Sequence, residues 1–288
     1  MRIFYFSFLF IFVSCLKDVS KQYDIQYDGD KIVINGYIDT KEGCVVYVSK
    51  SISSSATSTL DKLELNDARV YLIEDGNLII ELESMGKGLF KSDGFTPKID
   101  KKYAIKATSN TLKTVESESV VLPDSAQITN FRMIKDSITF NIKSSIFYFK
   151  LIDSQPFQRN YFKIDAVNDS TKTAYNDLLQ YFDNLNINTL ECDFDSDYNS
   201  NYFSDKCFDN IYIDAKYIVQ YGRSNTKVTE ISFIVAQTSK EYFEYSQSLV
   251  QPFNKIRAFI EPQLLYTNIK GGYGIFYAQN AKKYKFKL

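Results

Sequence analysis

One acidic stretch gathers the residues that could bind a metal ion. Asp193, Asp195 and Asp197 stand at alternate positions, and alternating side-chain oxygens can converge on one hard cation, as they do in calcium-binding loops. The stretch departs from the EF-hand pattern, because Tyr198 stands where glycine is required and Ser204 where a bidentate glutamate is required. Calcium is therefore the one candidate cofactor, and an acidic, solvated loop is the simpler interpretation.

The cysteines could carry a second kind of chemistry. Cys192 and Cys207 lie close in sequence and could form a disulfide in an oxidising compartment. Spacing alone does not establish the pairing. The alternative is that these two residues and Cys44 are buried thiols that pack as small hydrophobic side chains.

The fourth cysteine, Cys15, ends an apolar N-terminal segment. Arg2 supplies a positive charge, and residues Ile3–Val13 are almost entirely apolar. Such a run is too short for a bilayer, which takes roughly 20 apolar residues, but it fits a secretory signal. The serine directly before Cys15 resembles the bacterial lipobox, in which the cysteine is lipidated and becomes the first mature residue. We therefore expect residues 1–14 to be a lipoprotein signal peptide.

The chain lacks residues that several classes of enzyme reaction need. The chain has no histidine, which excludes Ser-His-Asp and Cys-His constellations in their usual form and histidine metal sites. A hydrolase that uses carboxylate pairs stays open, but candidates such as Asp193, Asp195 and Glu230 are too many to assign. We expect no catalytic residues and a protein that is not an enzyme.

A glycine-rich segment near the C-terminus could suggest phosphate binding. Gly271-Gly272-Tyr273-Gly274 lacks the Lys-Ser/Thr pair of a P-loop. Its glycines predict a tight turn or a bulge next to the last strand instead.

Composition bounds the fold and the partners. There are 34 basic and 35 acidic residues, so the chain has no basic footprint for nucleic acid. A hydrophobic content of 44% is enough for a substantial core. Tyrosine and phenylalanine are abundant, at 22 and 23 residues, and this favours strands over helices.

The first half of the mature chain predicts a β-sandwich. Residues 15–29 are polar and aperiodic, as expected of a linker between the lipid and the folded part. Apolar runs flank the turn Asp75-Gly76-Asn77, which is a hairpin signal. Strands are expected at Lys31–Ile38, Gly43–Ser51, Ala68–Glu74, Leu78–Glu83, Lys102–Thr108 and Thr114–Leu122. Their spacing predicts an immunoglobulin- or transthyretin-like sandwich over residues 30–123.

The second half predicts a further β-rich domain over residues 124–288, beginning at Pro123-Asp124-Ser125. One or two short helices interrupt it: Ser170–Leu185 changes to a helical period, and Thr238 with Glu241 looks like a capping box. Strands are expected at Gln127–Met133, Ser137–Lys143, Ile146–Ile152, Asn160–Val167, Ile211–Val219 and Val228–Ala236. The overall prediction is a mostly β protein of two sandwich-like domains.

A polar, aromatic segment, Asn184–Asn210, reads as a long loop. Tyr198, Tyr202, Phe203 and Phe208 lie in or beside its aromatic part. Aromatic side chains on a surface loop can give a large contact area for a ligand. We favour the alternative that they pack over the second domain's core, because large aromatic residues are more often buried than exposed.

Several stretches together resemble one known family. They are Ile34-Asn35-Gly36-Tyr37-Ile38, Asp67-Ala68, Thr96-Pro97-Lys98, Lys102-Tyr103, Ser239–Tyr245, Glu261-Pro262 and Tyr266–Phe276. The chain is similar to the domain-of-unknown-function family 4249 (DUF4249) of Bacteroidota lipoproteins. That resemblance implies an outer-membrane lipoprotein, often encoded beside a TonB-dependent transporter, and it carries over no catalytic residues.

These observations predict an outer-membrane lipoprotein, held by lipid on Cys15, that assists a TonB-dependent transporter in ligand capture or gating. Lys17-Asp18 after the cysteine resembles the charged surface-export signals of such lipoproteins and favours the cell surface over the periplasm. A cell-surface adhesin or structural binding module is the alternative. No nucleic-acid partner is expected.

Overall fold

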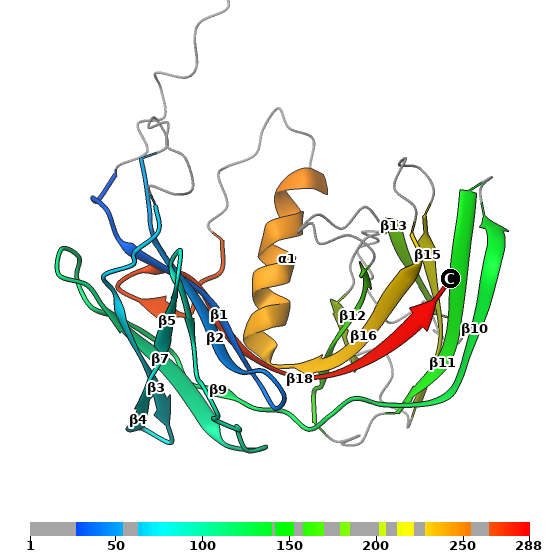
Figure 1. The fold of residues 1–288 in the computed structure, drawn as a ribbon, viewed down its shortest axis with the longest axis horizontal. Coiled ribbons are helices and arrows are strands. Elements are labelled where there is room, and N and C mark those ends of the chain that lie inside the picture. Colours follow the sequence, from blue (N-terminus) through cyan, green and yellow to red (C-terminus); the bar gives the residue numbers. More distant parts are fainter. Residues whose placement is uncertain are drawn as a thin grey trace, which may run out of the picture.

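The computed structural model describes residues 27–53, 63–139, 142–152, 158–169, 179–184, 202–205, 212–221, 228–254 and 265–288. These residues form a mostly β structure with three sheets and one helix (Figure 1), which confirms the predicted fold class. The helix found in this part of the chain is not long and apolar enough to cross a membrane.

The strands follow the chain in two groups. Those of the N-terminal part are β1 (Ile32–Asp39), β2 (Gly43–Lys50), β3 (Arg69–Glu74), β4 (Asn77–Glu81), β5 (Glu83–Gly86), β6 (Leu89–Lys91), β7 (Lys102–Thr108), β8 (Val115–Ser117) and β9 (Val120–Val121). Those that follow are β10 (Gln127–Thr139), β11 (Ile142–Ile152), β12 (Tyr161–Asn168), β13 (Leu179–Asn184), β14 (Tyr202–Ser204), β15 (Tyr212–Gln220), β16 (Glu230–Thr238), β17 (Ile269–Lys270) and β18 (Tyr273–Lys287), with α1 (Lys240–Asn254) before β17.

A single eight-stranded sheet runs through both halves, in the order β14-β12-β16-β18-β1-β2-β6-β5. The long last strand β18 makes the connection. Its first part pairs in parallel with β1, from Val33 opposite Tyr273 onward, and its second part pairs antiparallel with β16 as far as Glu230 opposite Lys287. Figure 1 shows β18 passing from the N-terminal strands to the C-terminal strands.

Two hydrophobic cores lie on the same face of this sheet. The first is closed by the six-stranded sheet that holds β3, β4, β7, β8 and β17, and it includes Ile34, Leu72 and Phe276. The second is closed by the sheet β10-β11-β15-β13, and there the rings of Phe147 and Phe233 stack at 4.7 Å. Alternation along β18 places Phe276 and Ala278 in the first core, so Tyr277 points to the opposite face.

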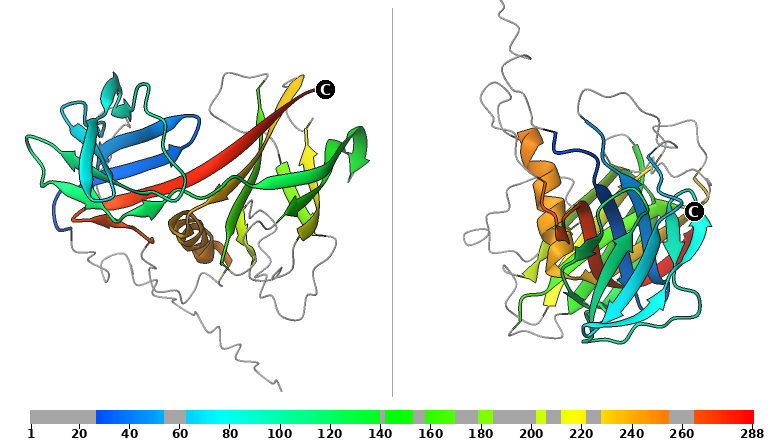
Figure 2. Two further views of the ribbon diagram at one scale, coloured as in Figure 1. Left: turned by 90° about the horizontal axis from the view of Figure 1, so that it is seen from below. Right: turned by 90° about the vertical axis from the view of Figure 1, so that its left-hand side faces the viewer.

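Helix α1 lies on that opposite face. Its Tyr242 contacts Tyr277 of β18 at a ring-centroid distance of 4.6 Å, and its Phe243 contacts Tyr161 of β12 at 5.2 Å. Two further views show α1 on one side of β18 (Figure 2). The large sheet therefore separates the two cores from the helix.

Buried polar contacts fix the middle of the large sheet. Asn280 of β18 donates from Nδ2 to the Pro123 carbonyl (3.2 Å) and accepts a hydrogen bond from Thr40 Oγ1 (2.9 Å). The buried Asp39 carboxylate accepts backbone N–H groups, including that of Ala281 (3.3 Å). The division into two domains at residue 123 stays a prediction, and β18 contributes to the cores on both sides of that point.

Two predictions about helices are wrong. The helix expected over Ser170–Leu185 does not form in its described part, because Leu179–Asn184 is strand β13, paired antiparallel with β15. The capping box is wrong because Thr238 ends β16, and α1 begins two residues later. Ser239 is the single residue between β16 and α1. Its amide donates to the Ala278 carbonyl (2.8 Å), and its hydroxyl accepts a hydrogen bond from the Ala278 amide (3.2 Å).

Candidate functional site

Most of the sites predicted from sequence lie outside the described residues. This holds for the lipidation site Cys15, for the disulfide candidates Cys192 and Cys207, and for the calcium candidates Asp193, Asp195 and Asp197. All three assignments therefore stay predictions. Within the described ranges, no group of three or more acidic or cysteine side chains could hold a metal ion. Glu230 is described, and it begins β16 in register with Lys287.

Cys44 behaves as a packed thiol. It is free and fully buried in the first core, and its amide donates to Ser92 Oγ at 2.7 Å. Burial raises the pKa of this thiol far above its usual value. The alternative interpretation, a buried thiol that packs as a small hydrophobic side chain, is therefore confirmed for Cys44.

The glycine-rich segment forms the turn that its sequence predicts. Gly271 has φ +79° and lies between β17 and β18. Gly274 has φ +100°, and a Cβ placed there would lie 1.9 Å from the Ile34 carbonyl oxygen. The glycine therefore allows β18 to approach β1 closely, which is a structural role.

The described aromatic residues of the predicted loop pack against the protein. Phe203 is buried and contacts Phe162 at 5.6 Å. The Tyr202 hydroxyl donates to the Ser246 carbonyl of α1 (3.0 Å), which fixes β14 against the helix. For these two residues the packing interpretation is confirmed, whereas Tyr198 and Phe208 lie outside the described residues.

The structure brings together a polar cluster that the sequence did not indicate. We call Lys163, Thr238, Tyr242 and Tyr277 the Lys163 cluster. Lys163 comes from β12, Thr238 from β16, Tyr242 from α1 and Tyr277 from β18. The Lys163 Nζ lies 5.3 Å from the centroid of the Tyr242 ring, and that ring contacts Tyr277. Because Lys163 pairs with Ala236 and Tyr161 pairs with Thr238 in register, Lys163 and Thr238 lie on the same face of the sheet.

The environment keeps the cluster protonated. Burial lowers the pKa of Lys163, but Tyr242, Tyr277 and Asp165 raise it, and the net shift is upward. Burial also raises the pKa of Tyr277, while the nearby Lys163 lowers it less. At neutral pH Lys163 is therefore an ammonium group and Tyr277 a neutral phenol, and both are hydrogen-bond donors.

Sequence reasoning missed this cluster because its members belong to four different elements. Lys163 stands in a run of alternating strand residues, where a lysine normally marks the solvent face. The abundance of tyrosine in Ser239–Tyr245 and near the C-terminus is the sequence signal that could have indicated the cluster.

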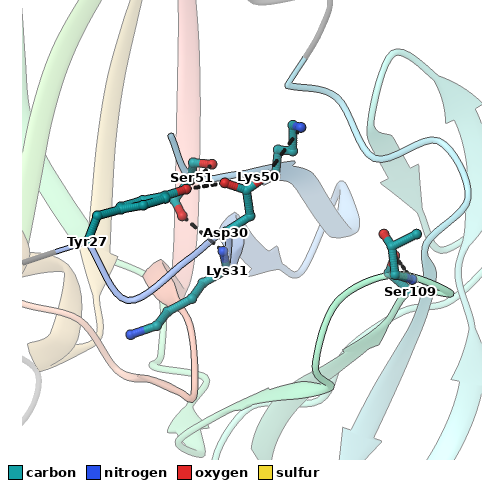
Figure 3. Close-up of polar contacts among 7 residues, drawn as sticks. Tyr27, Asp30, Lys31, Lys50, Ser51 and Ser109 are labelled. Carbon is teal, nitrogen blue, oxygen red and sulfur yellow. Dashed lines mark hydrogen bonds and ion pairs between the residues drawn. The ribbon is translucent and has the colours of Figure 1, made fainter. Parts of the chain in front are cut away.

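A second polar group holds the first described residues of the chain, just before β1, in place (Figure 3). The Tyr27 hydroxyl donates to the Asp30 carboxylate, which also pairs with Lys50 at 3.4 Å. The hydrogen bond from Tyr27, then that from Lys50, lowers the pKa of Asp30. Lys31 donates from its amide to Ser51 Oγ (2.9 Å). These contacts fasten the chain that enters β1 to the end of β2.

Comparison with known proteins gives a family. A family model described as Domain of unknown function (DUF4249) matches residues 20–285. The chain belongs to the DUF4249 family. This confirms the resemblance seen in the sequence, and the family description names no activity. No curated protein matches the DUF4249 chain.

Solved structures resemble the DUF4249 chain only weakly. A β-glucuronidase from glycoside hydrolase family 2 is 10% identical with a TM-score of 0.22, covering 72% of this chain and 18% of the enzyme. The extracellular domains 3–5 of Drosophila OTK are 8% identical with a TM-score of 0.20, covering 73% of this chain and 94% of that one. The chain thus spans less than a fifth of the β-glucuronidase, and similarity this low carries no inference about activity.

Proposed function

We propose that this DUF4249 protein is a non-catalytic lipoprotein of the outer membrane, displayed at the cell surface, that assists a TonB-dependent transporter in ligand capture or gating. The observation that carries the proposal is the apolar N-terminal segment that ends at Cys15, followed by a polar linker. The linker leads to Tyr27, where the described chain is fastened to β1 and β2.

Lipid attachment gives such a protein a physical advantage. Acyl chains confine the protein to the membrane plane, which raises its effective concentration beside a membrane partner without a large interface. One acyl chain gives only marginal membrane binding, and a second chain makes the attachment stable. A weak contact between the folded part of the chain and a transporter would then be sufficient to keep the two proteins together.

The folded part of the chain suits a role in transmitting force or position. One sheet runs through both cores, and Asn280 connects the two halves by part-buried hydrogen bonds with Pro123 and Thr40.

The test is co-purification from native membranes. Tagged protein is extracted in mild detergent and its partners are identified by mass spectrometry, with Cys15→Ser as the matched control. The proposal predicts a TonB-dependent β-barrel partner for the natural protein and a strong loss of that partner for Cys15→Ser. Recovery without any transporter, together with binding to host or matrix polymers, would favour the adhesin and overturn the transporter role.

A further inference from the structure

Exposed apolar side chains gather where the described chain begins. Tyr27, Ile52 and Tyr273 are 44%, 37% and 44% exposed, and we call these three residues the entry patch. The Tyr27 hydroxyl lies 3.5 Å from the carbonyl oxygen of Ser51, which directly precedes Ile52 (Figure 3). Lys31 connects the third residue, because its amide donates to Ser51 Oγ (2.9 Å) and its Nζ donates to the Tyr273 hydroxyl (3.3 Å). Three segments that are distant in sequence therefore form one surface.

The protein itself binds the polar ends of the two tyrosines. Tyr27 donates to the Asp30 carboxylate, and Tyr273 accepts from Lys31, whose Nζ lies 5.0 Å from the centroid of the Tyr273 ring. Two partly exposed rings beside an exposed isoleucine then make an amphipathic surface, with apolar area in the middle and polar groups at the rim.

The charge around the entry patch is balanced. Three ion pairs lie beside it in the chain: Lys31 with Asp28 (3.5 Å), Lys50 with Asp30 (3.4 Å) and Lys270 with Glu118 (4.0 Å). A surface with an excess of lysine would attract nucleic acid or anionic lipid, but a balanced surface offers no such net attraction. Binding at the entry patch must therefore come from its apolar area.

The place of the entry patch in the chain indicates what it faces. Tyr27 is twelve residues after Cys15, and an extended chain spans at most about 3.6 Å per residue, so Tyr27 lies within about 43 Å of the lipidation site. The β4 edge is farther along the fold. β17, which precedes Tyr273, forms one edge of the six-stranded sheet, and β4 forms the other, four strand spacings or about 19 Å away. The tether thus joins the folded chain at the entry patch.

We propose that the entry patch lies in the headgroup region of the membrane that holds the anchor, with Tyr27, Ile52 and Tyr273 in contact with lipid. Tyrosine is favoured at membrane interfaces because its ring is apolar and its hydroxyl is polar. The lipid on Cys15 already concentrates the protein there, so a weak contact is sufficient to favour one orientation. The inference rests on the proposed function for its anchor, and it adds a second membrane contact that turns the β4 edge away from the lipid.

The chain contains no tryptophan, so a single tryptophan is a specific reporter. Tyr273→Trp places it in the entry patch, and the matched control Leu78→Trp places it in β4, where Leu78 is 58% exposed. Each lipidated full chain is extracted from membranes and reconstituted into phosphatidylcholine vesicles, with or without bromine near the headgroup end of the acyl chains. Bromine should quench Tyr273→Trp several-fold more than Leu78→Trp. High salt should not change this difference, because the contact is apolar.

A second substitution tests whether the apolar area makes the contact. In the Tyr273→Trp protein, Ile52→Asp adds a charge to the entry patch and should reduce the quenching strongly. Leu78→Asp adds the same charge at β4 and should leave it unchanged. Both positions are exposed, so neither change disturbs a core. If Tyr273→Trp does not fold, Ile52→Trp is the reporter, with the same expected quenching.

Equal quenching of the two reporters, or quenching of neither, would overturn the inference. Quenching that disappears at high salt would overturn the apolar contact. Tyr273→Trp emission that changes only when a co-purified β-barrel protein is added to the vesicles would assign the entry patch to a protein partner instead. The intact mass of the same samples separates two failures. A lipidated chain with an unquenched reporter overturns only this inference, whereas an unmodified Cys15 overturns the proposed function as well.

Discussion

At the scale of single residues, burial sets the chemistry of this chain. Tyr103 is fully buried in the first core, and its hydroxyl oxygen accepts the Lys98 amide at 2.8 Å. Burial raises the pKa of Tyr103 from 10.0 to about 12, and the Lys98 hydrogen bond opposes this shift only in part. The neutral phenol is therefore favoured in the folded state.

This shift gives a prediction with a defined sign. Because the folded pKa lies above the unfolded one, the stabilisation is fully present below about pH 10 and is lost as the pH rises toward 12. In Tyr103→Phe, unfolding by urea should show a shallower loss of stability than the natural protein over this range. At pH 7 the variant should lose about 1 kcal/mol for the missing hydrogen bond. Parallel pH profiles for the two proteins would contradict the account.

Cys44 gives a second prediction at this scale. Its thiol is buried and its pKa is raised by burial, and thiolate is the form that reacts. In the folded protein at pH 8, Cys44 should resist alkylation by iodoacetamide and should react fully in denaturant. Peptide mapping separates it from the other cysteines. Rapid labelling under native conditions would show that this core is open.

Among the strands, the close approach of β18 to the backbone of β1 explains why Gly274 is a glycine. Gly274 and Gly29 both have positive φ, at +100° and +88°, but only Gly274 lies against another strand. Gly29→Ala should cost about 1–2 kcal/mol from strain alone. Gly274→Ala must also displace β1 from its parallel pairing and should destabilise the protein by at least about 3 kcal/mol. Equal melting temperatures for the two variants would contradict this explanation.

Elements with local signals could be predicted from the sequence. The strand Lys102–Thr108 forms as predicted, and Asp75-Gly76 forms the predicted turn between β3 and β4. Alternation and turn chemistry are local properties, so these signals do not depend on distant partners. Leu179–Asn184 shows the opposite case, because pairing with β15 overrides a short helical period.

Long-range contacts could not be predicted. Nothing near Val33 indicates its pairing with Tyr273, and nothing near Lys163 indicates Tyr242 or Tyr277. The candidate site consists of such contacts, whereas the lipid, disulfide and calcium sites that local motifs suggested lie outside the described residues.

At the scale of the whole molecule, β18 makes the two cores one structure. Phe276 packs in the first core, and Tyr284 and Phe286 pack against the second. Unfolding either core should therefore disrupt the strand that supports the other.

A cooperative transition is expected from this arrangement. Denaturant unfolding followed by far-ultraviolet circular dichroism, which reports on all sheets, should have the same midpoint as Cys44 exposure, which reports on the first core. Two separate midpoints would show that residues 30–123 and 124–288 fold as independent domains, as the sequence alone predicts.

The proposed function requires a lipid on Cys15 that holds the folded chain at the outer membrane. The most direct measurement is the intact mass of the protein extracted from membranes, with fragmentation of its N-terminal peptide. We expect a chain that begins at Cys15 and carries acyl chains on that residue. A mature chain that retains residues 1–14, or an unmodified Cys15, would contradict it.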